Sequence, residues 1–188
     1  MHRRSARITG ALSIVLVGSS LAGCGKEEPT RAVIPPPRAL EEVPAAAAGG
    51  ICRLLDYPSI EETTGVRFDV SAAGTHRDSN TCVLRSETAD RPELALSVTK
   101  TKVDATVFKE EMTPRGGKSV SGLGKAAYRV TLAPGKDHGA GVEVGWLTGD
   151  GQMAKLRYLF PVGEDRAAAD AFASKVVALA KTIDIGRR

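Results

Sequence analysis

Hydrophobic and polar residues alternate with a period of two in short segments between residues 66 and 160. This alternation is typical of β-strands that bury one face. We expect about six strands, at residues 66–70, 81–86, 94–101, 128–132, 142–146 and 153–160. In the last of them, apolar residues at 156, 158 and 160 alternate with Lys155 and Arg157. The sequence therefore places these two cations on an exposed face.

Three further segments, residues 52–64, 104–112 and 165–183, have the hydrophobic spacing of helices. The first has Pro58 near its start and ends before Gly65, while Asp104 is placed to cap the second. The last carries an apolar stripe that repeats every three or four residues: Ala168, Phe172, Val176, Leu179 and Ile183.

The order of these elements is helix, three strands, helix, three strands, helix. Short connections favour antiparallel pairing between strands that follow one another. The sequence therefore predicts an α+β domain, with an antiparallel sheet of about six strands and helices packed on one face.

The first 23 residues have the pattern of an export signal. Arg3, Arg4 and Arg7 precede an apolar run from residue 8 to residue 20. The segment ends in a sequence that resembles a bacterial lipobox, Leu21-Ala22-Gly23-Cys24. Such a cysteine carries a diacylglyceryl group after cleavage, and two acyl chains give stable anchoring. We therefore expect Cys24 to hold the protein on the outer face of the cell membrane.

The route of export is also suggested by this segment. Arg3-Arg4 could belong to a twin-arginine signal, but Ser5 and Ala6 stand where a hydrophobic residue is expected. General secretion is therefore favoured. No apolar run reaches the ~20 residues that a membrane-spanning helix needs.

Composition divides the remaining chain into a tether and a domain. Residues 24–50 contain five prolines and no aromatic residue, whereas every aromatic residue lies between Tyr57 and Phe172. We expect residues 24–50 to form a lipidated, Pro/Ala-rich tether and residues 51–188 to form a single globular domain.

The basic charge of the chain belongs largely to the export signal. The formal net charge is +4, from 26 Lys+Arg and 22 Asp+Glu, and residues 1–23 contribute three arginines and no acid. Removal of those residues leaves 23 basic against 22 acidic residues, a balance of +1. This near-neutral charge argues against a nucleic-acid partner.

Two cysteines remain once Cys24 is assigned to the lipid. An even pair in an oxidising compartment usually forms a disulfide, so we expect Cys52 and Cys82 to join the first helix to the second strand. A metal site that includes His76 or His138 is the alternative, although neither histidine shows a recognisable Cys/His spacing.

No catalytic constellation is recognisable. Ser97 and Lys100 match a Ser-x-x-Lys motif, but on a strand these two positions face opposite sides. The acidic pairs at residues 61–62 and 110–111 are typical of solvated helix faces. Trp146 lies in an apolar alternation, which favours a core position over a sugar-stacking surface. We predict no enzyme, no cofactor and no metal.

Several short motifs resemble actinobacterial lipoproteins of the family called domain of unknown function 3558. They are the lipobox, the Pro-rich tether, the Cys52-Arg53-Leu54-Leu55 opening, Gly65 after a helix, Cys82 at the start of a strand, the Gly-Leu-Gly-x-Ala-Ala-Tyr turn at residues 122–128 and the alanine-rich final helix. The likeness covers nearly the whole mature chain and implies an envelope lipoprotein of unknown activity.

The anchor, the tether and the lack of catalytic groups favour a lipid-anchored extracytoplasmic binding or interaction module of the cell envelope. Its predicted binding surface is the uncovered sheet face with Glu143, Lys155 and Arg157, which would contact an unknown envelope protein. A small-ligand carrier or sensor with a pocket between helices and sheet is the alternative, and an envelope enzyme is less favoured.

Overall fold

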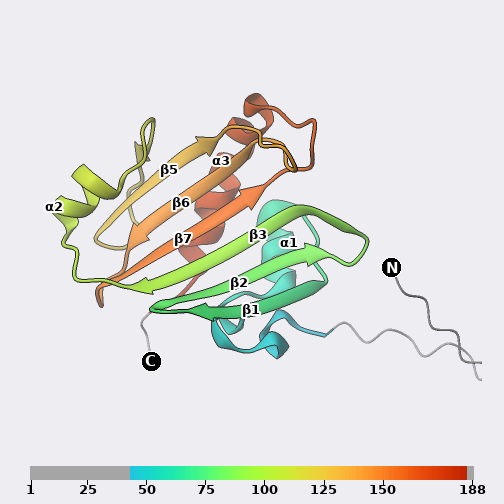
Figure 1. Cartoon of the computed structure of the whole chain (residues 1–188), viewed down its shortest axis with the longest axis horizontal. Coiled ribbons are helices and arrows are strands. Elements are labelled where there is room, and N and C mark those ends of the chain that lie inside the picture. The colour runs from blue at the N-terminus through green and yellow to red at the C-terminus, as the bar shows by residue number, and fades with distance from the viewer. Residues whose placement is uncertain (1–42, 186–188) are drawn as a thin grey trace, which may run out of the picture. The chain divides into compact units, whose positions relative to one another are not determined.

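A computed structural model describes residues 43–185 of the chain (Figure 1). The predicted export signal, the lipobox from Leu21 to Cys24 and most of the predicted tether lie outside these residues. Within the described part, no helix is long and apolar enough to cross a membrane.

The domain is built on one antiparallel sheet of seven strands in the order β1-β2-β3-β7-β6-β5-β4. The strands are β1 (Val70–His76), β2 (Ser79–Ser86), β3 (Ala89–Lys100), β4 (Lys118–Ser119), β5 (Ala126–Leu132), β6 (Gly141–Leu147) and β7 (Gln152–Leu159). The α+β class and the antiparallel sheet are confirmed. The number of strands was predicted too low by one because β4 has only two residues, too few to show an alternation.

The helices are α1 (Tyr57–Thr64), α2 (Ala105–Val107) and α3 (Arg166–Thr182). Two 3₁₀ helices, η1 (Ala45–Ala48) and η2 (Gly50–Leu54), precede α1, and a π-helical turn, η3 (Phe108–Met112), continues α2. The helix predicted over residues 52–64 is therefore two helices. Asp56 is extended and caps α1, because its carboxylate accepts a hydrogen bond from the Ser59 amide at 3.1 Å.

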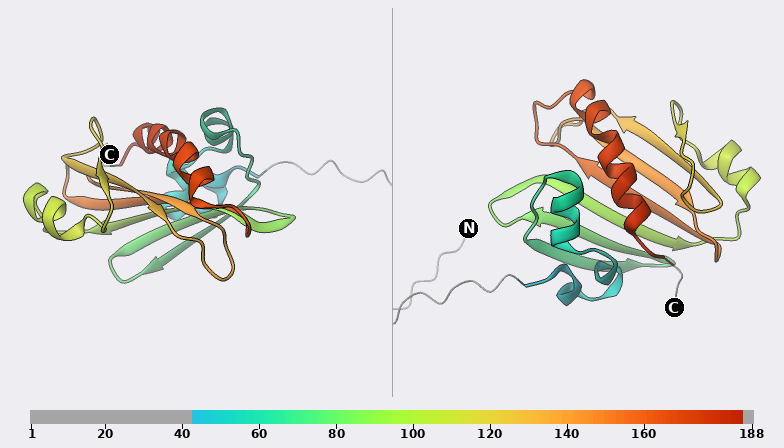
Figure 2. Two further views of the ribbon diagram at one scale, coloured as in Figure 1. Left: turned by 90° about the horizontal axis from the view of Figure 1, so that it is seen from above. Right: turned by 180° about the vertical axis from the view of Figure 1, so that it is seen from behind.

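Helices lie on both faces of the sheet, which corrects the prediction that they pack on one face. Helices α1 and α3 cover the same face and enclose the main core (Figure 2). On the opposite face, Phe108 of η3 packs against Tyr128, Val130 and Leu147. The apolar alternation of β5 therefore points away from α3, and this small cluster is what holds α2 and η3 to the sheet.

The packed domain includes residues that composition had placed in the tether. Ala45 is 1% exposed, and its carbonyl oxygen accepts a hydrogen bond from Ser71 Oγ of β1 at 3.2 Å. The strand predicted at residues 66–70 begins only at Val70, because Phe68 turns into the main core instead of pairing with a neighbouring strand.

The Cys52–Cys82 disulfide is present and joins η2 to β2. Both cysteines are fully buried, and 30 residues separate them in the sequence. The bond therefore fixes the N-terminal helices to the sheet within the main core.

Candidate functional site on the open sheet face

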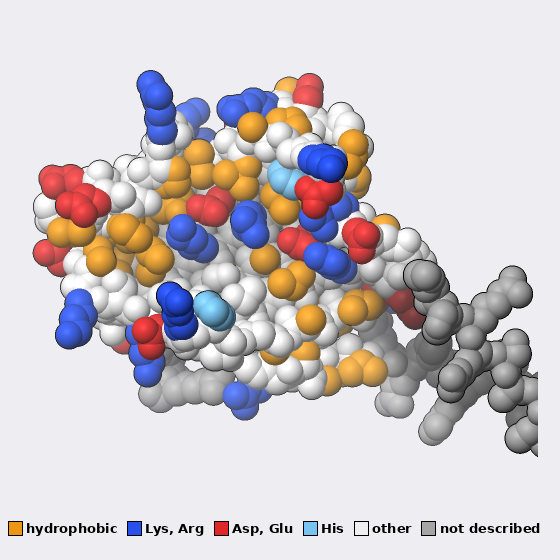
Figure 3. Space-filling model, in the orientation of Figure 1, with side chains coloured by type: hydrophobic (Ala, Val, Ile, Leu, Met, Phe, Trp, Pro, Cys, Tyr) orange, Lys and Arg blue, Asp and Glu red, His pale blue; other side chains and the backbone are white. Residues whose placement is uncertain are grey.

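The face of the sheet that points away from α1 and α3, here called the open face, carries all three predicted binding residues. Residues directly opposite each other in an antiparallel pair share one face. Glu143 of β6 is opposite Arg157 of β7, and Gly145 is opposite Lys155. Figure 3 shows charged side chains in the middle of this face, with hydrophobic side chains to either side. The structure thus brings Glu143, Lys155 and Arg157 together on adjacent strands.

Glu143 is the centre of a small polar cluster. Its side chain is only 13% exposed, and its Oε1 atom lies 4.0 Å from Lys155 Nζ. The same oxygen accepts a hydrogen bond from the Tyr128 hydroxyl at 2.7 Å. These two partners compensate a carboxylate that the fold has largely removed from water.

Tyr128 reaches Glu143 because a glycine lies beneath its ring. Gly145 is opposite Tyr128 in the β5–β6 ladder, and a Cβ atom there would lie 2.6 Å from the tyrosine oxygen. The pKa of Tyr128 is raised well above 10.0, mainly because the phenol is buried. The hydrogen bond to Glu143 and the negative charge of Glu143 raise it further. Tyr128 is therefore a neutral hydrogen-bond donor across the physiological range.

Tyr128 was not among the site residues predicted from the sequence. The available signal was Gly145 in the middle of an apolar strand, since a strand glycine often marks the close approach of another group. The residue that approaches depends on the register between β5 and β6, which the alternation pattern alone does not define.

Arg157 differs from its neighbours because it is exposed and makes no ion pair with any residue from 43 to 185. Since Lys155 already faces Glu143, the charge of Arg157 is not compensated within the described part of the face.

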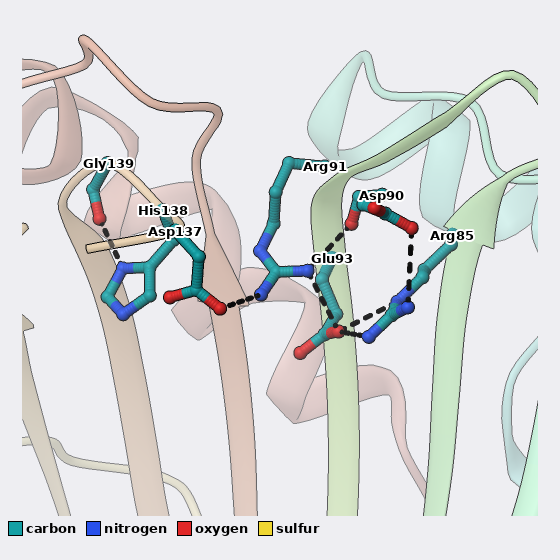
Figure 4. Close-up of polar contacts among 7 residues, drawn as sticks. All are labelled: Arg85, Asp90, Arg91, Glu93, Asp137, His138 and Gly139. Carbon is teal, nitrogen blue, oxygen red and sulfur yellow. Dashed lines mark hydrogen bonds and ion pairs between the residues drawn. The ribbon is translucent and has the colours of Figure 1, made fainter. Parts of the chain in front are cut away.

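A second polar cluster lies where β2 and β3 meet the loop between β5 and β6 (Figure 4). Glu93 is 9% exposed, and its Oε2 atom accepts hydrogen bonds from Arg85 Nε at 2.8 Å and Arg91 Nη1 at 3.3 Å. Arg91 Nη2 lies 3.8 Å from Asp137 of that loop. Arg91 therefore connects β3 to the β5–β6 loop, and the carboxylate of Glu93 compensates the charge of this half-buried arginine.

Uncharged polar side chains lie on the same face along β2 and β3. The hydroxyl oxygens of Thr81 and Ser97 are 3.2 Å apart, and Thr99 donates a hydrogen bond to Ser79 at 3.1 Å. Ser97 is opposite Lys155 in the β3–β7 ladder. These hydroxyl pairs thus extend the polar surface from the Glu143 cluster across β3 to β2.

A groove lies elsewhere, at the end of the helix-covered face. It has a volume of about 410 Å³ and lies between η2, the β6–β7 hairpin and the segment after α3. Arg53, Asn80, Asp150 and Gln152 are among its lining residues. The pKa of Asp150 is lowered, chiefly by a hydrogen bond from Thr148 and to a smaller extent by one from Gln152. Its carboxylate therefore stays charged. The alternative carrier hypothesis requires a pocket between helices and sheet, and this groove is lined by η2 and by sheet residues.

Among residues 43–185, no group of three or more His, Cys, Asp or Glu side chains is arranged to hold a metal ion. Cys52 and Cys82 are in the disulfide, and His138 Nδ1 lies 2.6 Å from the Gly139 carbonyl oxygen (Figure 4).

The chain matches no protein-family model, no curated protein and no solved structure.

Proposed function

We propose that the chain is a lipid-anchored extracytoplasmic binding module of the bacterial cell envelope. Its open face would bind a protein partner that presents a carboxylate to Arg157. The single observation that carries this proposal is the exposed, unpaired guanidinium of Arg157 beside the compensated pair of Glu143 and Lys155. The proposal assigns no catalytic step to the chain.

Charge complementarity supports an acidic partner. Glu143 is engaged by Tyr128 and Lys155, so the charge that remains for a partner on these strands is positive. Arginine is enriched at binding hot spots because its planar fork forms two hydrogen bonds with one carboxylate. The rigid ladder beneath Arg157 would limit the entropy lost when a partner binds.

The lipid anchor is a separate element of the proposal. The lipobox from Leu21 to Cys24 and the resemblance to the domain of unknown function 3558 family support it. We expect Cys24→Ser, in a chain whose residues 1–23 are replaced by a signal that is cleaved without lipidation, to move the protein from the membrane fraction to the soluble extracytoplasmic fraction, because both acyl chains are lost. If the Cys24→Ser chain stays with the membrane after a salt wash, the anchor is not at this cysteine.

The binding face is tested by photo-cross-linking of the full chain on living bacteria. A photoreactive amino acid replaces Thr99 on the open face in one strain and exposed Ala178 of α3 in another. We expect a discrete cross-linked partner only from position 99. Arg157→Glu should abolish that product, whereas Arg157→Lys, which keeps the charge, should retain most of it. Equal products from both positions, or an unchanged product with Arg157→Glu, would contradict the proposal.

A small-ligand carrier is the second candidate, because the groove of about 410 Å³ has the size of a small-ligand site. We expect a carrier to show a ligand-dependent rise in melting temperature in a screen of lipids, glycans and antibiotics. Leu54→Trp, which would narrow the groove, should remove the rise. A screen with no stabilisation, or a rise that Leu54→Trp leaves intact, would exclude this groove as the carrier site.

A further inference from the structure

A second pocket, of about 270 Å³, lies between the sheet edge at β4 and β5 and the N-terminal part of α3. It shares no residue with the open-face site, because Arg129 of β5 is opposite Val144, which lies in the core beneath α3. Its charged lining residues are Arg115, Lys118, Arg129, Arg166 and Asp170. Four cations and one carboxylate give a formal charge of +3.

The cations come from four separate segments of the chain. Arg115 lies in the loop before β4, Lys118 is in β4, Arg129 is in β5 and Arg166 is the first residue of α3. No single helix or loop therefore accounts for the cluster, which exists only in the folded domain.

None of the four cations is compensated by the described part of the chain. Arg115, Lys118, Arg129 and Arg166 make no ion pair and no side-chain hydrogen bond with residues 43–185. Asp170, the one carboxylate of the pocket, accepts a hydrogen bond from Thr131 Oγ1 at 2.5 Å and lies beyond ion-pair distance of the cations.

The strand register brings two of these like charges together. Lys118 is directly opposite Arg129 in the β4–β5 ladder, and like charges at directly opposite positions repel each other. An anion bound between them would remove this repulsion. The pocket thus has both the charge and the geometry to favour an anionic ligand.

We propose that this pocket binds a phosphate group, carried by a small soluble ligand or by the headgroup of an anionic phospholipid. A phosphomonoester carries close to two negative charges, which match the pocket better than the single charge of a carboxylate. Three of the four cations are arginines, whose planar fork binds phosphate oxygens in pairs. This inference is independent of the proposed role of the open face.

The experiment uses the mature chain, residues 24–188, with Cys24→Ser, so that neither the export signal nor a lipid anchor contributes to binding. One arm titrates inorganic phosphate and glycerol phosphate by calorimetry, with sodium chloride at equal ionic strength as the control. The other arm measures sedimentation with vesicles of phosphatidic acid, whose headgroup is a phosphomonoester, and with neutral phosphatidylcholine vesicles. Binding in the first arm identifies a soluble ligand, and binding to anionic vesicles alone identifies a headgroup.

Matched variants separate the pocket from general charge attraction. The pocket variant is Arg129→Gln/Arg166→Gln, and the control is Lys109→Gln/Lys136→Gln, which removes two exposed cations outside the pocket. We expect the pocket variant to weaken binding at least about tenfold and the control to change it less than about twofold. Lys118→Gln, at an exposed edge position, supplies a variant that should fold normally and still weaken binding.

The proposal is overturned if neither arm shows binding above its control. It is also overturned if the pocket and control variants lose binding equally, since the surface would then attract anions only through its overall charge. Lys118→Gln that folds normally and binds like the wild type would contradict the pocket as the site.

Discussion

The two faces of the sheet use the same strands in opposite ways. On β6, Val142, Val144 and Trp146 point toward α3 and are buried in the main core. The alternate residues Glu143 and Gly145 point to the open face. Helices cover the β6 side chains on the helix-covered face. On the open face, the ring of Tyr128 covers β6 at Gly145.

This difference shows how a sheet can present charge without losing order. On the helix-covered face, order comes from close packing of apolar side chains, which is nondirectional. On the open face, directional contacts hold Glu143: one hydrogen bond from Tyr128 and one ion pair with Lys155. We therefore expect the first face to supply most of the stability of the domain and the second to supply a defined polar surface.

The largest effect is expected from Trp146→Ala on the helix-covered face. Trp146 is buried in the main core, and removal of its indole would leave a cavity beneath the helices. We expect the free energy of unfolding to fall by about 3–5 kcal/mol in urea titrations. The control is Val162→Ala, because Val162 is 69% exposed and its loss should change stability by less than about 0.5 kcal/mol. Similar losses from both variants would contradict the assignment of the core.

Removal of the disulfide should have the next largest effect. Cys52→Ser/Cys82→Ser opens a loop that the bond closes across 30 residues. On the chain-entropy model the free energy of unfolding should fall by about 3–4 kcal/mol. Reduction of the wild-type chain should lower it by a similar amount in the same urea titration. A reduced chain as stable as the oxidised one would show that the N-terminal helices do not depend on the bond.

Much of the fold follows from the sequence because its signals are local. Asp104 caps α2 as expected, with its carboxylate accepting hydrogen bonds from the amides of Thr106 and Val107. The final helix was expected at residues 165–183, and α3 forms over Arg166–Thr182 with Asp165 as its cap. Caps and helical periodicity involve neighbours along the chain, so the sequence contains the whole signal.

The errors arise where tertiary contacts decide between local alternatives. The alternation of residues 128–132 predicts a strand, but not that Tyr128 faces away from Val144 of the neighbouring strand. The choice of face depends on Phe108, which is distant in the sequence and covers β5 from the open side. The pairing of Lys118 with Arg129 likewise depends on a two-residue strand that no periodicity could show.

On the open face, the position of Tyr128 depends on the absence of a side chain at Gly145. A Cβ atom in Gly145→Ala would lie 2.6 Å from the tyrosine oxygen and would force Tyr128 away from Glu143. We expect a loss of about 1–3 kcal/mol in the free energy of unfolding from this overpacking. Gly149→Ala is the matched control, because its Cβ would meet no atom within 4 Å. If both variants are equally stable, Tyr128 is not held by Gly145.

The smallest expected effect is a decrease of stability at alkaline pH. Two buried tyrosines contribute to it, one on each face of the sheet. Burial raises the pKa of Tyr128 on the open face, with Glu143 adding to the shift. Burial raises the pKa of Tyr158 on the helix-covered face, with the charge of Glu164 adding to it. Below pH 10.0, the ordinary pKa, folded and unfolded chains both retain these protons, so stability does not depend on them.

Above that pH the unfolded chain loses the two protons while the folded chain keeps them, so the free energy of unfolding falls as pH rises. Each tyrosine contributes up to about 1.4 kcal/mol per pH unit. Urea titrations between about pH 9 and about pH 11 should therefore show a shallower decline in Tyr128→Phe and in Tyr158→Phe than in the wild type. At neutral pH, Tyr128→Phe should also cost about 0.5–1.5 kcal/mol, because Glu143 loses its hydroxyl donor. An unchanged alkaline slope in Tyr128→Phe would mean that this phenol is open to water, and the open face would then lack the ordered polar cluster that distinguishes it.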